Sequence, residues 1–153
     1  MTPSPYAPPK ASLETGAGDV APALWNPDAA GVWSVFLTPV FGSTLLLRNW
    51  QAIGDESRAR TGRIWLIASV IMLVVSGFVP LLGFVYLVTW YFLWQRKQTK
   101  YVRERWGTDY PRKKWGKAVA IGVGALVGLW ILPLALGALT AVVLALLQAL
   151  TGG

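Results

Sequence analysis

Residues 64–94 read IWLIASVIMLVVSGFVPLLGFVYLVTWYFLW, a run without a charged side chain. An apolar run of this length is typical of a segment inside a lipid bilayer. As one straight helix it would be roughly 46 Å long, well beyond the ~30 Å hydrocarbon core. Pro80 lies near its middle, where proline removes a backbone donor and restricts the residue before it. We therefore predict two helices joined by a bend at Pro80.

A second uncharged run covers residues 118–150 and also has a proline, Pro133, near its middle. The same argument predicts a second hairpin, bent at Pro133. Gly124 and Gly128 form a G-x-x-x-G pattern that allows close helix approach. We predict that they are helix-packing residues, either within the chain or between two copies of it.

A third apolar segment, residues 29–47, follows Asn26, a good N-cap, and Pro27, which suits a first helical position. It is long enough to cross a membrane once or to bend at Pro39 and return, and the sequence leaves both open. The predicted fold class is all-α: a polytopic helical integral membrane protein with about four to five membrane-embedded helices. We expect one domain over residues 25–153, after a disordered, proline-rich tail over residues 1–24.

Composition narrows the functional classes. The chain is 54% hydrophobic and has neither cysteine nor histidine, which removes thiol chemistry, the usual zinc sites and the commonest general base. The three apolar segments contain no ionisable carboxylate or amine, the usual sign of a membrane-embedded functional site. We expect no enzyme, no metal and no cofactor.

The net charge of +7 is concentrated in two loops, residues 48–63 and 95–117. Basic loops beside apolar segments follow the positive-inside rule, so we predict that both loops are cytoplasmic and that residues 95–117 contact anionic lipid headgroups. Their position next to the membrane makes nucleic acid an unexpected partner. The predicted lipid- or partner-contact residues are Arg96, Lys97, Lys100, Arg103, Arg105, Arg112, Lys113, Lys114 and Lys117. The predicted aromatic anchors at the membrane interface are Trp65, Trp94, Trp106 and Trp115.

The segment from Leu24 to Ala30, with Trp33-Ser34 after it, resembles a family of small uncharacterised bacterial inner-membrane proteins that open with W-N-P-x-A-A-x-x-W-S. The stretch from Tyr101 to Trp115 is similar to the downstream part of that family. This resemblance implies a location in the bacterial inner membrane and supplies no catalytic role.

We therefore expect a non-enzymatic membrane protein that acts through lipid or membrane-protein contacts at residues 95–117. A sharper hypothesis is membrane shaping, because hairpins with both ends on one face occupy more area in one leaflet. The alternatives are a small transporter or channel subunit and an immunity or regulatory protein that binds a membrane partner. Arg58, Arg60 and Arg63 either hold lipid phosphates or anchor the topology.

Overall fold

The computed structural model describes residues 20–151, so residues 1–19 of the predicted tail and residues 152–153 lie outside the described part. The described residues form an all-α fold, as predicted, with one isolated β-bridge between Leu24 and Arg112. The elements, in chain order, are α1 (Pro27–Ile53), α2 (Glu56–Ser76), α3 (Pro80–Trp90), the π-helical turn η1 (Tyr91–Gln95), α4 (Arg96–Trp106) and α5 (Gly116–Thr151).

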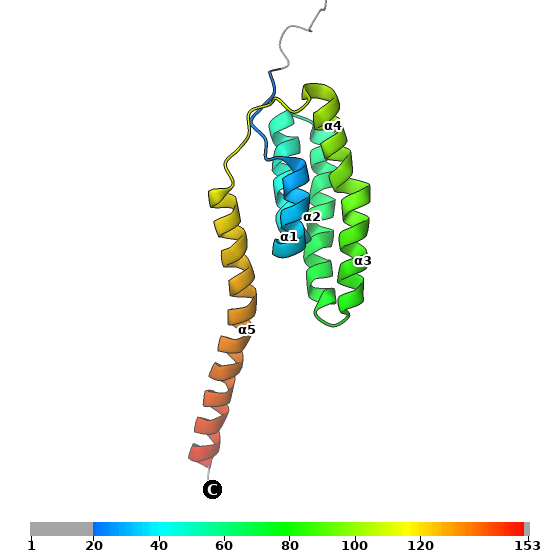
Figure 1. Ribbon diagram of the computed structural model, residues 1–153. Coiled ribbons are helices and arrows are strands. Elements are labelled where there is room, and N and C mark those ends of the chain that lie inside the picture. The colour runs from blue at the N-terminus through cyan, green and yellow to red at the C-terminus, as the bar shows by residue number, and fades with distance from the viewer. Residues whose placement is uncertain (1–19, 152–153) are drawn as a thin grey trace, which may run out of the picture.

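Helix α1 consists of two limbs that reverse direction at Thr38, where φ is 76° and ψ is 154°. The backbone N–H of Trp25 donates to Oδ1 of Asn49 at 3.0 Å. A straight helix would separate these residues by roughly 36 Å. The limbs are therefore antiparallel and both ends of α1 lie at the same end of the molecule (Figure 1). Residues 29–47 therefore bend and return, which is one of the two possibilities that the sequence left open, and they do not cross once.

A glycine lets the two limbs of α1 approach. A Cβ atom at Gly42 would overlap the Ser34 hydroxyl and lie 2.7 Å from the Trp90 ring. Ser34 is buried, and its hydroxyl donates to the carbonyl of Ala30 at 2.7 Å. Small residues at such crossings allow close helix packing. The crossing of the limbs thus depends on Gly42 and on Ser34, whose hydroxyl is paired with a carbonyl of its own limb.

The hairpin predicted at Pro80 is confirmed. Helix α2 ends at Ser76, whose hydroxyl donates to the carbonyl of Leu73 at 2.8 Å, and Pro80 begins α3. Between the limbs, the hydroxyls of Ser69 and Tyr86 are 2.9 Å apart. Paired polar side chains therefore hold the two helices together.

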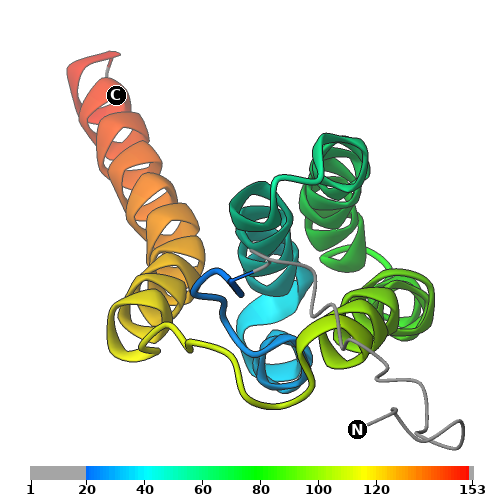
Figure 2. The ribbon, with the colours of Figure 1, turned by 90° about the horizontal axis from the view of Figure 1, so that it is seen from above.

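The hairpin predicted at Pro133 is wrong. Helix α5 runs without a break from Gly116 to Thr151, with Pro133 inside it. Within α5 only Gly122 is buried, and residues 118–132 have no hydroxyl, amide or charged side chain that could pair with a second half folded back. Helices in apolar surroundings tolerate an internal proline. Seen from above, α5 stands to one side of the group formed by α1 to α4 (Figure 2).

Three helices, α1, α2 and α5, are long and apolar enough to cross a membrane. Because α1 reverses at Thr38, its limbs measure only roughly 16 and 22 Å at 1.5 Å per residue. Helix α5, with 36 residues, is roughly 54 Å long. The three helices therefore differ widely in the distance that each covers in one direction.

Candidate functional site

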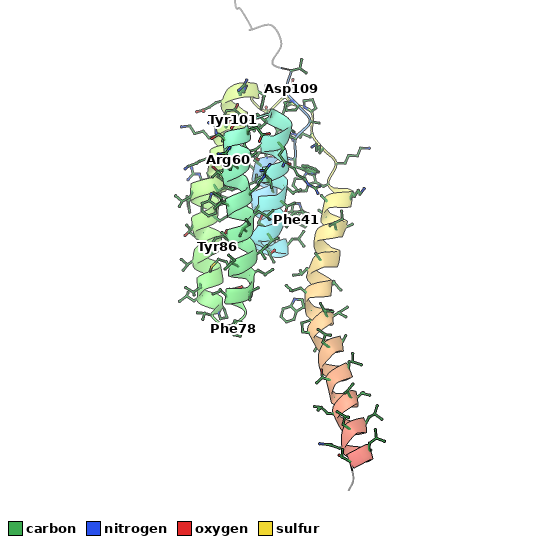
Figure 3. The ribbon with its side chains drawn as sticks, turned by 180° about the vertical axis from the view of Figure 1, so that it is seen from behind. Phe41, Arg60, Phe78, Tyr86, Tyr101 and Asp109 are labelled. Atoms are coloured by element: carbon green, nitrogen blue, oxygen red, sulfur yellow. The ribbon has the colours of Figure 1, made fainter. Side chains whose placement is uncertain are left out.

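Figure 3 places Tyr101 and Asp109 at one end of the bundle and Phe78 at the other. The end with Tyr101 carries α4 and the linker to α5, residues 96–117, which we name the basic cap. The cap includes all nine predicted contact residues. The cap has two acidic side chains, Glu104 and Asp109, and Asp28 of α1 lies against α4. Nine cations and these three carboxylates give this end a net charge of +6.

Buried amides attach α4 to α1. The Nδ2 of Asn49 donates to Oε1 of Gln98 at 3.0 Å, and Nε2 of Gln98 donates to the carbonyl of Leu46 at 2.9 Å. Nε2 of Gln95 donates to the carbonyl of Pro27 at 2.9 Å. Both glutamines are fully buried, where an unpaired polar group is costly, and Oε1 of Gln95 has no partner among the described residues. Gln98 of α4 is thus fixed to the second limb of α1, and Gln95 of η1 is fixed to the first.

Sequence reasoning missed these amides. Asn49 follows one apolar segment, and Gln95 and Gln98 follow another. The available signal was the spacing of Trp94 and Gln98, four residues apart and therefore on one helical face. That spacing predicts that the two side chains share a face. It does not predict that this face packs against α1, because that contact depends on the reversal of α1.

The π-helical turn η1 adds a residue to the helix and changes which side chains face inward. Trp94 is 5% exposed, and its ring stacks on that of Trp65 with centroids 6.3 Å apart. The prediction that Trp94 is an anchor at the membrane interface is therefore wrong, because its ring packs inside the bundle. Trp65, Trp106 and Trp115 are half-buried, and their role as anchors stays a prediction.

Arg58 joins the two basic loops. Its guanidinium lies 4.9 Å from the Trp50 ring centroid and 4.4 Å from that of Tyr101, and it forms an ion pair with Asp55 at 2.9 Å. Such stacked cations contribute about 0.5–2 kcal/mol each. Arg58 therefore has a structural role in holding α4 to the start of α2.

The linker is attached to the N-terminal segment through Leu24. The N–H of Leu24 donates to the carbonyl of Pro111 at 2.9 Å, and the N–H of Lys113 donates to the carbonyl of Leu24 at 2.9 Å. Leu24 is fully buried against Val102 and Tyr110. The predicted tail boundary therefore needs correction, since Leu24 belongs to the fold.

Tyr110, which packs against Leu24 in the linker contact, is uncharged. Burial raises the pKa of its hydroxyl above the ordinary value, Arg112 opposes this, and Asp28 adds to it. The phenol is therefore protonated throughout the physiological range, and it adds no negative charge to the basic cap.

The cap's cations differ in how they are engaged. Arg103 lies 3.3 Å from Asp28, Lys100 lies 3.7 Å from Glu104, and Lys113 lies 4.2 Å from the Trp25 ring centroid. The two ion pairs are exposed and contribute little to stability. Three further cations form no ion pair or ring contact within residues 20–151: Lys97, Lys114 and Lys117.

A shallow hollow of about 550 Å³ follows the exposed face of α4. Four of the nine predicted contact residues line it, Arg96, Lys97, Lys100 and Arg103. Asp28 and Glu104 line it as well and pair with Arg103 and Lys100. Guanidinium and ammonium groups around such a hollow bind phosphate oxygens by charge-assisted hydrogen bonds. Among the described residues, no group of three or more acidic side chains could hold a metal ion.

A second cavity, of about 340 Å³, lies at the reversal of α1. Five hydroxyl-bearing residues from α1, α2 and α3 line it: Ser34, Thr38, Ser69, Ser76 and Tyr86. Sequence reasoning missed this cavity because its wall exists only when α1 turns back against the hairpin. The serines inside otherwise apolar helices were the available signal.

Within residues 20–151, Gly124 and Gly128 do not make the packing contact predicted for them. A Cβ atom at either glycine would have open space around it, whereas one at Gly122 would lie 2.9 Å from Leu37 and Phe41. The contact between α5 and α1 therefore centres on Gly122. Packing of Gly124 and Gly128 between two copies stays a prediction.

Comparison with known proteins identifies no relative. No family model, curated protein or solved structure matches the chain. The resemblance carried by the segment from Leu24 to Ala30 therefore stays a prediction.

Proposed function

We propose that this chain is a non-enzymatic, multi-pass protein of the bacterial inner membrane. In this proposal the basic cap binds anionic headgroups at the cytoplasmic face and the bundle below it shapes the membrane. The observation that carries the proposal is the reversal of α1 at Thr38, which confines both of its limbs to the cap end. The charge of the cap and the length and hydropathy of α2 and α5 support it.

The helices reach unequal depths, which gives the bundle the shape of a wedge that is wider at the cap end. From Thr38 to Arg48, α1 reaches roughly 15 Å, about half of the ~30 Å hydrocarbon core. Helices α2 and α3 continue past the tip of α1 to their own turn at Gly77 (Figure 1). The cap-side leaflet therefore holds two limbs that the other leaflet lacks, and this excess of protein favours bending toward the far side.

The cap sets the orientation of the wedge. Each basic residue near an anionic leaflet contributes ~1 kcal/mol of binding. Lys97, Lys114 and Lys117 are exposed and form no ion pair within the described residues, so they are the cations most available to headgroups.

Reconstitution tests this proposal. Vesicles of phosphatidylethanolamine and phosphatidylglycerol that contain increasing amounts of the full chain should become smaller or tubular in electron micrographs. A triple variant with Lys97→Gln, Lys114→Gln and Lys117→Gln should bend them less, and the matched variant with arginine at the same positions should bend them as the natural chain does. Vesicle diameters that do not change with protein density would contradict the proposal.

A second function, a small transporter or channel subunit, is favoured by the cavity at Thr38. Irregular backbone inside a membrane is tolerated where it lines a water-filled cavity. Five hydroxyls around this cavity suit a small uncharged solute. Swelling of vesicles in glycerol measures such a flux: rates above those of protein-free vesicles, lowered by Ser69→Ala, support transport, and equal rates exclude it.

A further inference from the structure

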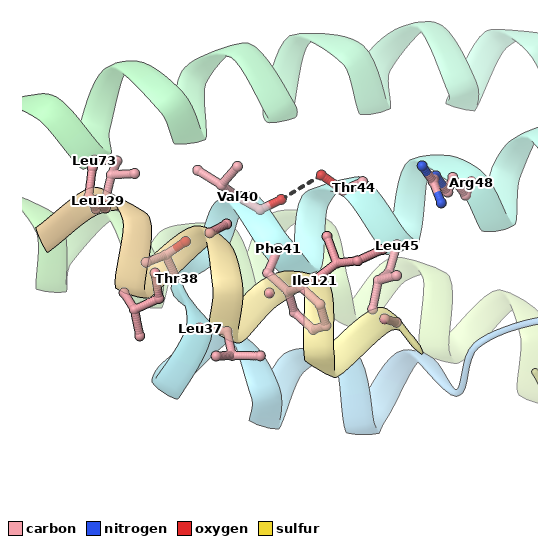
Figure 4. A pocket seen from close by; sticks show the side chains of 14 residues that line it. Leu37, Thr38, Val40, Phe41, Thr44, Leu45, Arg48, Leu73, Ile121 and Leu129 are labelled. Carbon is pink, nitrogen blue, oxygen red and sulfur yellow. Dashed lines mark hydrogen bonds between the residues drawn. The ribbon is translucent and has the colours of Figure 1, made fainter. Parts of the chain in front are cut away.

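A narrow apolar groove separates α5 from the second limb of α1 (Figure 4). It encloses about 260 Å³ and lies apart from the hollow on α4. Its walls include Phe41 and Leu45 of α1 and Ile121, Ala125 and Leu129 of α5. These positions recur every three or four residues, so the groove runs along the second limb of α1 and the first third of α5.

One end of the groove is charged. Arg48 closes the end that lies nearest the cap, opposite Thr38 and Leu129 at the other end (Figure 4). Arg48 is exposed and forms no ion pair, hydrogen bond through its side chain or ring contact within residues 20–151. The hydroxyl of Thr44, which also lines the groove, donates to the carbonyl of Val40 at 2.8 Å. The groove therefore combines an apolar slot with a single available cation at its mouth.

We propose that this groove holds one acyl chain of an anionic phospholipid, with the lipid phosphate at Arg48. The inference rests on the membrane location given in the proposed function and names a specific lipid site beside the general charge of the cap. A guanidinium is suited to this task because its paired donors match phosphate oxygens.

The length of the groove matches one leaflet. From Ala118 to Leu129 the α5 wall rises roughly 16 Å, about half of the ~30 Å hydrocarbon core. A chain that begins at a phosphate beside Arg48 would therefore end near the bilayer midplane, at the level of Thr38. Charge and length thus point to the same occupant.

The width of the groove excludes a helix from a second copy. Gly122 brings α5 so close to α1 that an added Cβ would lie 2.9 Å from Leu37 and Phe41. A helix with its side chains is about 10–12 Å across, too wide to enter beside that contact. A second copy would also have to bury the unpaired charge of Arg48, which is costly.

Native mass spectrometry of the full chain in mild detergent tests the proposal with two probes, dioleoyl phosphatidylglycerol and dioleoyl phosphatidylcholine. The natural chain should retain one lipid and prefer phosphatidylglycerol. Arg48→Gln should lower that preference about tenfold, because it removes charge-assisted hydrogen bonds. Arg60→Gln removes an equal charge from the exposed face of α2 and should leave the preference unchanged. Ala125→Phe, which fills the groove, should lower binding of both lipids.

Four results would overturn the proposal. Equal losses in the Arg48 and Arg60 variants would assign the preference to overall charge. Equal binding of both lipids by the natural chain would remove Arg48 as the phosphate site. Unchanged binding by a folded Ala125→Phe variant would place the acyl chain elsewhere. Vesicles that bend normally while no lipid is retained in detergent would refute this site and leave the proposed function standing.

Discussion

Residues 64–94 and 118–150 are alike in sequence and different in structure. Both runs lack charge and both have a central proline, yet the first reverses at Pro80 and the second continues through Pro133. The residues before each proline differ. Ser76 and Gly77 end α2, and Val79 takes an extended φ of −132°, whereas an uninterrupted helix leads into Pro133.

Contacts between the limbs separate the two runs further. In the first run Trp90 is fully buried and Ser69 pairs with Tyr86. In the second run Trp130 is 70% exposed and nothing of α5 beyond Gly122 is buried. A proline therefore permits a reversal, and side chains that pair the two limbs make it stable.

The largest expected effect is on topology. Because α5 does not reverse, single cysteines in place of Asp109 and Leu150 should be labelled from opposite sides of the membrane, with no overlap in accessibility. A cysteine in place of Lys113 should share the side of one in place of Arg58. Labelling of positions 109 and 150 from the same side would mean that the second run is a hairpin after all.

Trp90 is buried and Trp130 is exposed, so replacing them should cause unequal losses of stability. Trp90→Ala should lower the free energy of unfolding by about 3–5 kcal/mol, because it leaves a cavity in the core. Trp130→Ala, the matched change in the second run, should lower it by less than about 0.5 kcal/mol. Unfolding in mixed micelles, followed by circular dichroism, measures both, and equal losses would show that α5 is packed.

Thr38 provides a second reversal, one that has no glycine at the turn. Its φ of 76° with ψ of 154° is a conformation that only glycine adopts readily. Thr38→Gly should therefore raise the free energy of unfolding by about 1–3 kcal/mol. The same micelle titration measures it, with Thr89→Gly in regular helix as a control that should lose stability.

Gly83 and Gly137 follow the two prolines at similar distances. A Cβ atom at Gly83 would lie 2.6 Å from Cβ of Ser76, whereas one at Gly137 would meet nothing within 4 Å. Gly83→Ala should cost about 1–2 kcal/mol through overpacking, and Gly137→Ala should be neutral or stabilise by up to about 1 kcal/mol. Identical responses would remove the packing difference between the runs.

The smallest expected effect concerns the hydroxyl pair in the first hairpin. A double-mutant cycle with Ser69→Ala and Tyr86→Phe should give a coupling energy of about 0.6 kcal/mol, the usual size for hydrogen bonds between membrane helices. A cycle with Thr140→Ala in place of Ser69→Ala should give none, since the Thr140 hydroxyl donates to Leu136 within α5, whereas that of Ser69 also meets the Tyr86 hydroxyl. A coupling of zero in the first cycle would leave aromatic packing as the main link.

Much of the candidate site follows from local signals. Gly107, with φ of 66°, ends α4, and the nine predicted contact cations lie together because all of them come from residues 96–117. The hydroxyl-lined cavity and the groove at Arg48 were not predicted, since each has walls from helices distant in sequence. The inward position of Trp94 was missed because η1 shifts the helical phase.

Composition and local chemistry are enough to establish an all-α chain with long apolar helices, a bend at Pro80 and a concentrated basic region. These features depend on hydropathy, charge and backbone restrictions that act within a few residues. The return of α1, the buried amides around Asn49 and the straightness of α5 depend on packing between distant segments. Whether a helix reverses or continues at a proline is a small energetic difference, and the contacts available to each limb decide it.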